Sequence, residues 1–188
     1  YFACEHYGIT PDIVTMGKGL GGGAIALSAV GVRESHFETV RQGAGSFNHG
    51  GTFTHHGPAA AAGLAVLKII ENENLVDRAN HMGKALLDNF KESLGSHPNI
   101  ADIRGSGLLM GLEIVEDKDR LKPFGRDRKI TEKLCQTIFD NGVAVYGSTG
   151  LAGIDGDALL IGPAFTIEKG QMDQIVETVR NAVHQVLN

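Results

Sequence analysis

The stretch GITPDIVTMGKGLGGG, residues 8–23, contains the features that decide the fold of this chain. Its Pro-Asp pair is a turn signal, and the apolar and β-branched residues 13–16 that follow predict a short buried strand. A glycine-rich loop, 17–23, comes directly after that strand and contains Lys18. Glycines let another group approach the backbone closely. The stretch therefore predicts an α/β scaffold with a ligand-lined loop at a strand end.

The first half of the chain continues with further strands and helices. An apolar strand is expected over 24–32 and a short polar helix over 34–41. Residues 42–57 predict a long loop rich in Gly, His and Thr, and loops of that length are usually functional. Helices are expected over 58–70, opened by a proline, and over 75–94, where apolar residues keep helical spacing.

The composition changes after residue 94. Two strands are predicted around the Gly-Ser-Gly turn 105–107, and an amphipathic helix ends the chain. The segments expected between them are a helix over 130–140, short strands over 143–146, 159–161 and 165–167, and a flexible loop over 147–156. We therefore divide the chain into residues 1–94 and a small α+β domain of residues 95–188.

The composition excludes several classes of protein. Of the 188 residues, 42% are hydrophobic and 21% charged, which is typical of a globular protein in solution. The net charge is -5 and the basic residues are scattered, so we expect no nucleic-acid partner. No apolar run has the length of a membrane span. The two cysteines form no disulfide framework, which favours a cytoplasmic location, and the histidines lack metal-ligand spacing, so no metal is expected.

Lys18 is the first candidate for chemistry. A lysine at a strand end among glycines, partly removed from water, would have a lowered pKa, and its neutral amine could attack a carbonyl. An ordinary solvated loop lysine is the alternative, and the pattern alone favours it. A phosphate-binding P-loop needs a glycine five residues before a Gly-Lys-Ser/Thr run, and this sequence has neither that glycine nor the hydroxyl residue.

Residues 47–56 are the second candidate. They carry hydroxyl groups and glycines just before a predicted helix N-terminus, where N–H groups suit an anion such as phosphate. A Gly/Thr turn with ordinary helix capping is the alternative, and it stays open on the pattern alone.

Four segments in the right order resemble class III aminotransferases, which depend on pyridoxal phosphate (PLP). Residues 8–23 closely resemble the motif of the PLP lysine, and residues 51–56 look like the second cofactor segment of the family. Residues 104–113 resemble its small-domain hairpin, and residues 162–165 stand where the family has a proline turn before its last helix. The resemblance implies fold type I, with this chain as the C-terminal portion.

The resemblance also implies roles for individual residues. Residues 1–94 would be the end of the large PLP-binding domain with interdomain helices, and residues 95–188 the small C-terminal α+β domain. Lys18 would form the Schiff base with PLP and move the proton during transfer of an amino group from an amine or amino acid to a 2-oxo acid such as pyruvate. Thr52, assisted by the backbone near Gly51, would bind the PLP phosphate of the neighbouring subunit in a homodimer.

Two features depart from the family pattern. Many members that accept α-carboxylates have an arginine shortly before the late proline turn, but residues 146–162 contain none, as in ω-transaminase-like members. The carboxylate partner of the PLP ring nitrogen would precede Tyr1, so we expect the chain to be part of a longer protein. Aminomutase, decarboxylase and racemase reactions share the Lys18 motif and stay open, as does a non-enzymatic phosphate-binding module.

Overall fold

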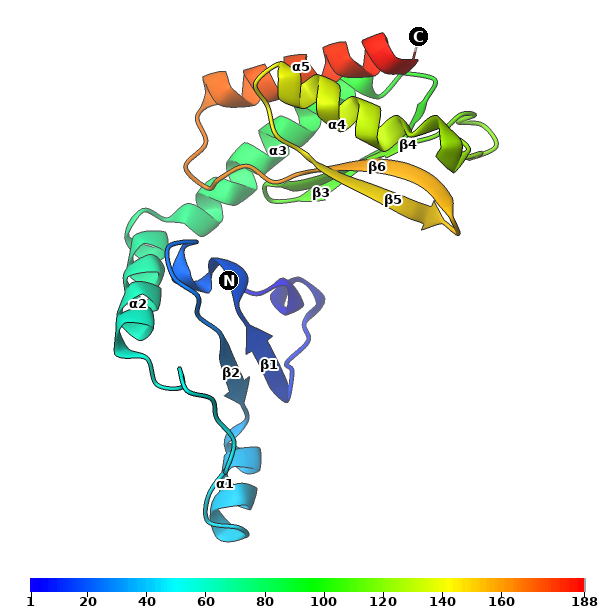
Figure 1. Ribbon diagram of the computed structural model, residues 1–188. Coiled ribbons are helices and arrows are strands. Elements are labelled where there is room, and N and C mark those ends of the chain that lie inside the picture. The colour runs from blue at the N-terminus through cyan, green and yellow to red at the C-terminus, as the bar shows by residue number, and fades with distance from the viewer. Residues whose placement is uncertain (188) are drawn as a thin grey trace. The chain divides into compact units, whose positions relative to one another are not determined.

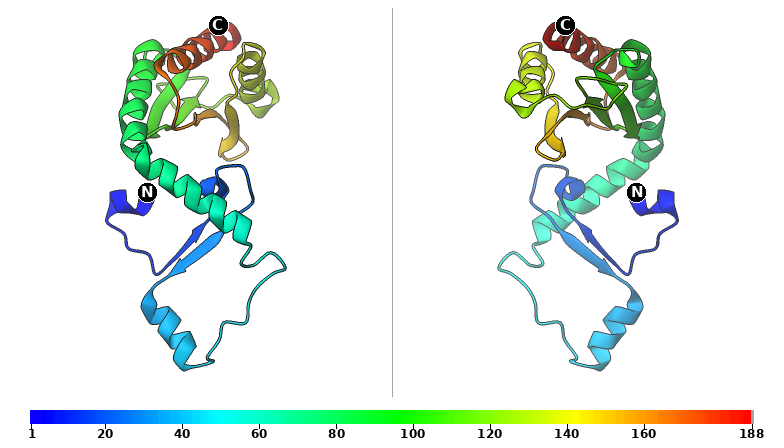
Figure 2. Two further views of the ribbon diagram at one scale, coloured as in Figure 1. Left: turned by 90° about the vertical axis from the view of Figure 1, so that its left-hand side faces the viewer. Right: turned by 90° about the vertical axis from the view of Figure 1, so that its right-hand side faces the viewer.

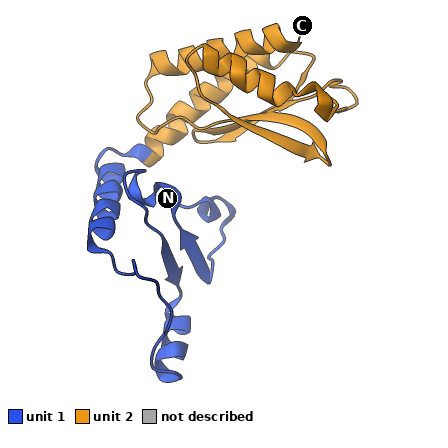
Figure 3. Ribbon diagram, viewed as in Figure 1, with its two compact units in different colours: residues 1–75 blue, residues 76–188 orange. Residues whose placement is uncertain are grey.

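The computed structural model describes residues 1–187, and Figure 1 shows a mixed α/β chain. The backbone divides into two compact units, Tyr1–Leu75 and Val76–Asn188, which Figure 3 colours separately. None of the helices in the described range combines the length and the apolar character needed to cross a membrane.

Unit 1 is built around a two-stranded antiparallel ribbon. Its strands pair Ile13 with Val32 and Met16 with Ala29. The elements of the unit are the 3-10 helices η1 (Ala3–Tyr7) and η2 (Lys18–Gly21), the strands β1 (Ile13–Met16) and β2 (Ala29–Val32), and the helices α1 (Glu34–Gln42) and α2 (Gly57–Asn72).

The predicted strand over 24–32 is wrong in its first half, because only β2 is a strand. Gly22 and Gly23 have φ angles of 65° and 74°, which take the backbone out of the extended conformation as it leaves η2. The Ala24 N–H then donates to the Gly21 carbonyl at 3.1 Å, so this part of the segment continues a turn. The strand at 13–16 and the helix after residue 57 are confirmed, but the strand is not buried as predicted, since Ile13 keeps 58% of its surface exposed.

Unit 1 has almost no hydrophobic core of its own. Its buried residues are Gly21, Ala59, Gly63 and Leu75. On the ribbon, Val30 keeps 64% of its surface exposed. A two-stranded ribbon is marginal in water unless other elements cover an apolar face. The packing that residues 1–75 supply is therefore too small to account for a stable unit.

Unit 2 buries one face of a four-stranded antiparallel sheet against three helices (Figures 1 and 2). The strand order is β3-β4-β6-β5. One core joins Phe90 of the first helix, Leu112 and Leu159 of the two central strands and Val179 of the last helix, all of them fully buried. The elements are α3 (Leu75–Leu94), β3 (Ile100–Ser106), β4 (Leu109–Ile114), η3 (Arg126–Arg128), α4 (Ile130–Asp140), β5 (Tyr146–Ala152), β6 (Asp155–Ile161) and α5 (Lys169–Leu187).

The predicted flexible loop over 147–156 is wrong, because these residues form most of the β5–β6 hairpin. Ser148 pairs with Ala158 and Thr149 with Asp157. Glycine-rich segments have weak strand propensity. This segment is a strand because it pairs with β6, most of which is buried. The structure also moves the β3–β4 turn to residues 107–108, since Ser106 pairs with Leu109.

The strands predicted over 143–146 and 165–167 do not form, apart from Tyr146 at the start of β5, because their backbone groups are engaged elsewhere. The Val143 N–H donates to the Ile138 carbonyl at 3.2 Å and so completes the end of α4. In the segment 165–167, the Arg78 guanidinium donates hydrogen bonds to the carbonyl of Phe165 at 3.0 Å and to that of Ile167 at 2.6 Å. A single side chain of α3 thus fixes the connection between β6 and α5.

Packing places α3 with unit 2, since Leu86, Phe90 and Leu94 lie in its core. The division of this chain by contacts accordingly comes at Leu75, ahead of the boundary expected from composition. The assignment of residues 1–94 to a large domain and of residues 95–188 to a small one concerns the complete protein and stays a prediction.

A buried carboxylate fastens α4 to the sheet. Asp157 on β6 is 2% exposed and accepts hydrogen bonds from the Thr131 backbone N–H at 2.9 Å and from the Thr131 hydroxyl at 2.6 Å. Thr131 lies in the first turn of α4, where N–H groups lack intrahelical acceptors and where negative charge is favourable. This pair therefore fixes the start of α4 over the central strands.

We predict that Gly83→Ala destabilises unit 2 by about 3 kcal/mol, because the new methyl group would lie 2.0 Å from the Gly107 carbonyl oxygen in the β3–β4 turn. Gly170→Ala is the matched helical control, since a Cβ there meets nothing within 4 Å, and it should stabilise by about 0.5–1 kcal/mol. Urea unfolding followed by far-ultraviolet circular dichroism measures both. An unchanged midpoint for Gly83→Ala would show that the turn moves away freely.

Candidate functional site

Lys18 is separated from β1 by Gly17 alone and begins the 3-10 helix η2. Its φ angle is 50°, in the left-handed region that non-glycine residues adopt at a cost of roughly 1–2 kcal/mol. The turn around it is closed by the Leu20 N–H, which donates to the Gly17 carbonyl at 3.1 Å, and by the Gly22 N–H, which donates to Gly19 at 2.9 Å. A strained backbone held by its surroundings is a signature of functional positions.

The Lys18 side chain is exposed in this chain. The pattern alone favoured an ordinary solvated lysine over one partly removed from water, and within residues 1–75 no residue encloses it.

Helix α2 supports the Lys18 turn through its small residues. A Cβ on Gly63 would lie 2.6 Å from Leu27 Cδ2 and 3.5 Å from the Leu20 carbonyl oxygen. A Cβ on Gly22 would lie 2.8 Å from Val66 Cγ2. Glycine in a helix interior costs stability, so its presence at Gly63 is explained by this close approach. The fold therefore fixes where the backbone of Lys18 lies.

Gly51 and Thr52 lie in a second turn, immediately before α2. The Thr54 N–H donates to the Gly51 carbonyl at 3.0 Å, and the Gly51 N–H donates to the Thr54 hydroxyl at 2.7 Å. These two bonds close the turn and leave Thr52 exposed within it. His55 follows with a φ angle of 62°, a second strained residue of the unit.

The N-terminus of α2 is open to an anion. His56 at the N-cap makes no side-chain capping bond, and the first turn contains no acidic residue. The first N–H groups of a helix lack intrahelical acceptors, and the helix dipole places partial positive charge there. Hydroxyl and N–H donors of this turn thus combine into an end suited to phosphate.

The Lys18 turn and the Gly51–Thr52 turn are not joined directly. Within residues 1–187, no hydrogen bond joins Lys18 to Gly51 or Thr52. Both segments are linked to α2, but in different ways. The 3-10 helix η2 packs against α2, whereas the Gly51 turn precedes α2 in the chain.

One structural contact near the site was missed by sequence reasoning. The Arg33 guanidinium lies 3.1 Å from the Asp12 carboxylate through Nε and donates to the Thr10 carbonyl at 2.9 Å. This pair fastens the segment that enters β1 to the residue that precedes α1. No local pattern could reveal it, because the partners are 23 and 21 residues apart in the sequence and meet only when the ribbon forms.

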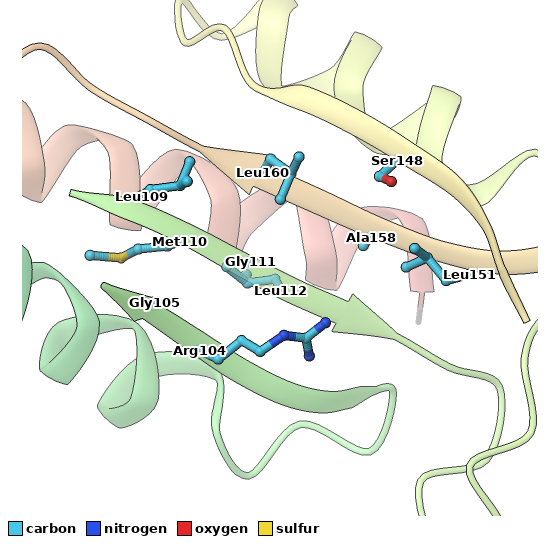
Figure 4. Close-up of a pocket in the computed structure, with 10 residues that line it drawn as sticks. All are labelled: Arg104, Gly105, Leu109, Met110, Gly111, Leu112, Ser148, Leu151, Ala158 and Leu160. Atoms are coloured by element: carbon cyan, nitrogen blue, oxygen red, sulfur yellow. The ribbon is translucent and has the colours of Figure 1, made fainter. Parts of the chain in front are cut away.

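Unit 2 offers a shallow hollow of about 200 Å³ on the open face of its sheet (Figure 4). Leu109, Leu160 and Ser148 line it together with Arg104. The Arg104 guanidinium is engaged by Asp102 at 2.7 Å and by Glu113 at 2.9 Å, and these hydrogen bonds raise its pKa. Arg104 therefore serves an ion pair across β3 and β4 and offers little to a substrate carboxylate.

No group of three or more His, Cys, Asp or Glu side chains in the described chain could hold a metal ion. The candidate site thus consists of a lysine amine, a hydroxyl turn and a helix N-terminus. By their chemistry the lysine amine fits a carbonyl group, and the hydroxyl turn with the helix N-terminus fits a phosphate.

Comparison with protein families agrees with that chemistry. The model of the family described as Aminotransferase class-III matches residues 1–183. This chain belongs to the class III aminotransferase family. The resemblance found from the sequence motifs is confirmed.

Curated and solved relatives of this aminotransferase homologue are longer proteins. The uncharacterized aminotransferase YodT of Bacillus subtilis is 35% identical over 187 residues, which are 98% of this chain and 42% of YodT. Taurine–pyruvate aminotransferase of Rhodobacter capsulatus is 31% identical, over 99% of this chain and 41% of its own. The crystal structure of an (S)-enantioselective ω-transaminase from Thermomicrobium roseum superposes with a TM-score of 0.89 at 33% identity, covering 98% and 39%.

The chain therefore spans about two fifths of the length of the relatives it matches. Its mixed α/β structure matches that part of a transaminase. The family is PLP-dependent. Relatives that are named for their reaction include putrescine–pyruvate and taurine–pyruvate aminotransferases.

We predict that Gly22→Ala loosens the Lys18 turn, because it adds left-handed strain and a methyl group 2.8 Å from Val66. Gly19→Ala is the control, since a Cβ there meets nothing within 4 Å. Hydrogen exchange of the full-length protein should be roughly tenfold faster over residues 17–27 in Gly22→Ala, as expected for a loss of about 1.4 kcal/mol. Equal exchange in both variants would contradict the proposed support from α2.

Proposed function

We propose that the complete protein catalyses PLP-dependent transamination, moving an amino group from an amine or amino acid to a 2-oxo acid such as pyruvate. The observation that carries the proposal is the strained, exposed Lys18 at the end of β1, within the segment that matches the family. We propose fold type I for the complete protein, with this chain as the end of its large domain and its small C-terminal domain.

The residues of unit 1 fit PLP by their chemistry. Lys18 would hold the cofactor through its amine, and the Thr52 hydroxyl would donate to the phosphate. The amide of Gly51 already donates to Thr54 Oγ1, so Gly51 would help through the shape of the turn. When bound, PLP supplies the electron sink for the reaction.

Lys18 would also do the acid–base work. The free amine of Lys18 would be a base that accepts a proton from the substrate carbon and returns it. Because the backbone of Lys18 is fixed, its Nζ can only reach positions within one side-chain length of that backbone. That restriction is the positioning on which proton transfer depends.

We further propose a homodimer in which Thr52 serves the cofactor of the partner subunit. The segment around Thr52 supports this, because Phe47 and Phe53 on either side of it are 75% and 83% exposed. Large exposed apolar side chains in a ligand-binding loop are typical of a surface that another chain covers. A cytoplasmic location stays a prediction.

We predict that Lys18→Ala in the full-length protein lowers kcat at least about 1,000-fold, because both the anchor and the proton carrier are lost. Lys68→Ala, at an exposed position of α2, should leave kcat unchanged. Borohydride reduction of the native protein should fix the yellow chromophore on the peptide that contains Lys18, as read by mass spectrometry. Full activity of Lys18→Ala, or a colourless native protein, would refute the PLP assignment.

The same assay separates transamination from related reactions. Formation of alanine from pyruvate with an amine donor supports the proposal. Release of CO₂, isomerisation or racemisation without transfer to a 2-oxo acid would point to a decarboxylase, an aminomutase or a racemase.

We predict that Thr52→Val weakens PLP binding about tenfold, because a hydrogen bond to a charged phosphate contributes roughly 1.5 kcal/mol or more. Thr52→Ser keeps the hydroxyl and should bind PLP normally. Equilibrium dialysis of the full-length protein measures the two dissociation constants, and sedimentation velocity reports the dimer. An active monomer, or equal affinities for the two variants, would contradict the role given to Thr52.

A further inference from the structure

A buried histidine lies far along the chain from the candidate site, in the segment that joins α3 to β3. His97 is 6% exposed, and its Nδ1 accepts a hydrogen bond from the Asn99 N–H at 3.1 Å. Because Nδ1 is an acceptor, a neutral ring carries its proton on Nε2. Within the described chain, the buried Nε2 has no hydrogen-bond partner.

The last helix covers this ring with a second histidine. His184 lies in the last turn of α5, and its ring centroid is 5.1 Å from that of His97 with the planes tilted by 58°. The segment after β4 contributes Lys118, whose ammonium donates to the Gly95 carbonyl at 2.8 Å. From α3 and β3, His97 meets backbone groups, since its N–H donates to the Leu94 carbonyl and its carbonyl accepts from Ile100.

The surroundings of His97 disfavour its protonation in three ways. Protonating Nδ1 would set two donors face to face and remove the hydrogen bond from Asn99. The Nε2 proton would gain charge in a place without an acceptor. His184 and Lys118 add positive charge to the surroundings whenever they carry a proton.

We propose that the His97–His184 contact is an acid-sensitive anchor, which holds the last turns of α5 on the α3–β3 connection while the His97 ring is neutral and loosens them when His97 takes up a proton. The pair ties the C-terminal helix to the α3–β3 connection, two segments that are almost 90 residues apart. Acid therefore weakens the packing of the C-terminal end of α5 against this connection.

The direction of the pH effect follows from the folded state. Burial, then the charge of His184, then that of Lys118, lower the pKa of His97 below its ordinary value of 6.5. The unfolded chain then binds a proton at a higher pH than the folded chain does. Stability that is present above pH 6.5 is lost as the pH falls below that value, until the lowered pKa of His97 is reached.

Hydrogen exchange of the full-length protein tests this anchor, with rates corrected for the intrinsic effect of pH. Between pH 7.5 and 5.5, protection of residues 180–187 should fall roughly fivefold more than protection of α4, which serves as the internal reference. In His97→Asn the difference should vanish, because the Asn side-chain oxygen still accepts from Asn99 but does not titrate. His81→Asn, at an exposed position of α3, is the matched control and should behave as wild type.

His184→Gln provides a second variant that keeps His97 and removes the facing ring, so a smaller acid effect is expected there. Equal loss of protection in α5 and α4 of the wild type would overturn the proposal. So would an undiminished acid effect in both His97→Asn and His184→Gln. None of these readouts depends on transaminase activity or on bound PLP, so they are independent of the proposed function.

Discussion

Burial of one apolar face of the β3-β4-β6-β5 sheet against α3, α4 and α5 is the constraint on which this structure depends. It aligns the central strands, fixes the strand order and recruits α3, the helix that continues from unit 1. Elements with weak intrinsic propensity follow from it. The glycine-rich β5 is a strand because β6 offers it a ladder, and Asp157 on β6 fixes the start of α4.

Unit 1 shows the opposite balance between local geometry and burial. Its ribbon and helices bury few residues, yet it holds Lys18 in a left-handed conformation inside a turn closed by hydrogen bonds and supported by α2. Such a backbone is expensive, and the cost is offset by the fit between Gly22 and Val66 and between Gly63 and Leu27. The unit thus fixes the Lys18 turn with little burial of its own.

Much of the fold followed from local patterns where those patterns are strong. The helices at α2, α3 and α4 were placed within about two residues, because apolar spacing and proline or glycine at their ends act locally. The candidate site was reached by motif resemblance, since strand, glycine loop and lysine are adjacent in sequence. The β5–β6 hairpin, the turn at 165–167 and the Asp12–Arg33 pair were missed, because each depends on a partner distant along the chain.

By itself the sequence determined the family and the order of the helices, and it singled out Lys18 as a candidate, because these rest on neighbouring residues and on short-range periodicity. Only the tertiary structure decided the strained backbone of Lys18 and the contact of the buried His97 with the exposed His184. Backbone strain, helix exposure and burial are properties of a packed chain. They arise when segments tens of residues apart compete for the same space and the same hydrogen-bonding groups.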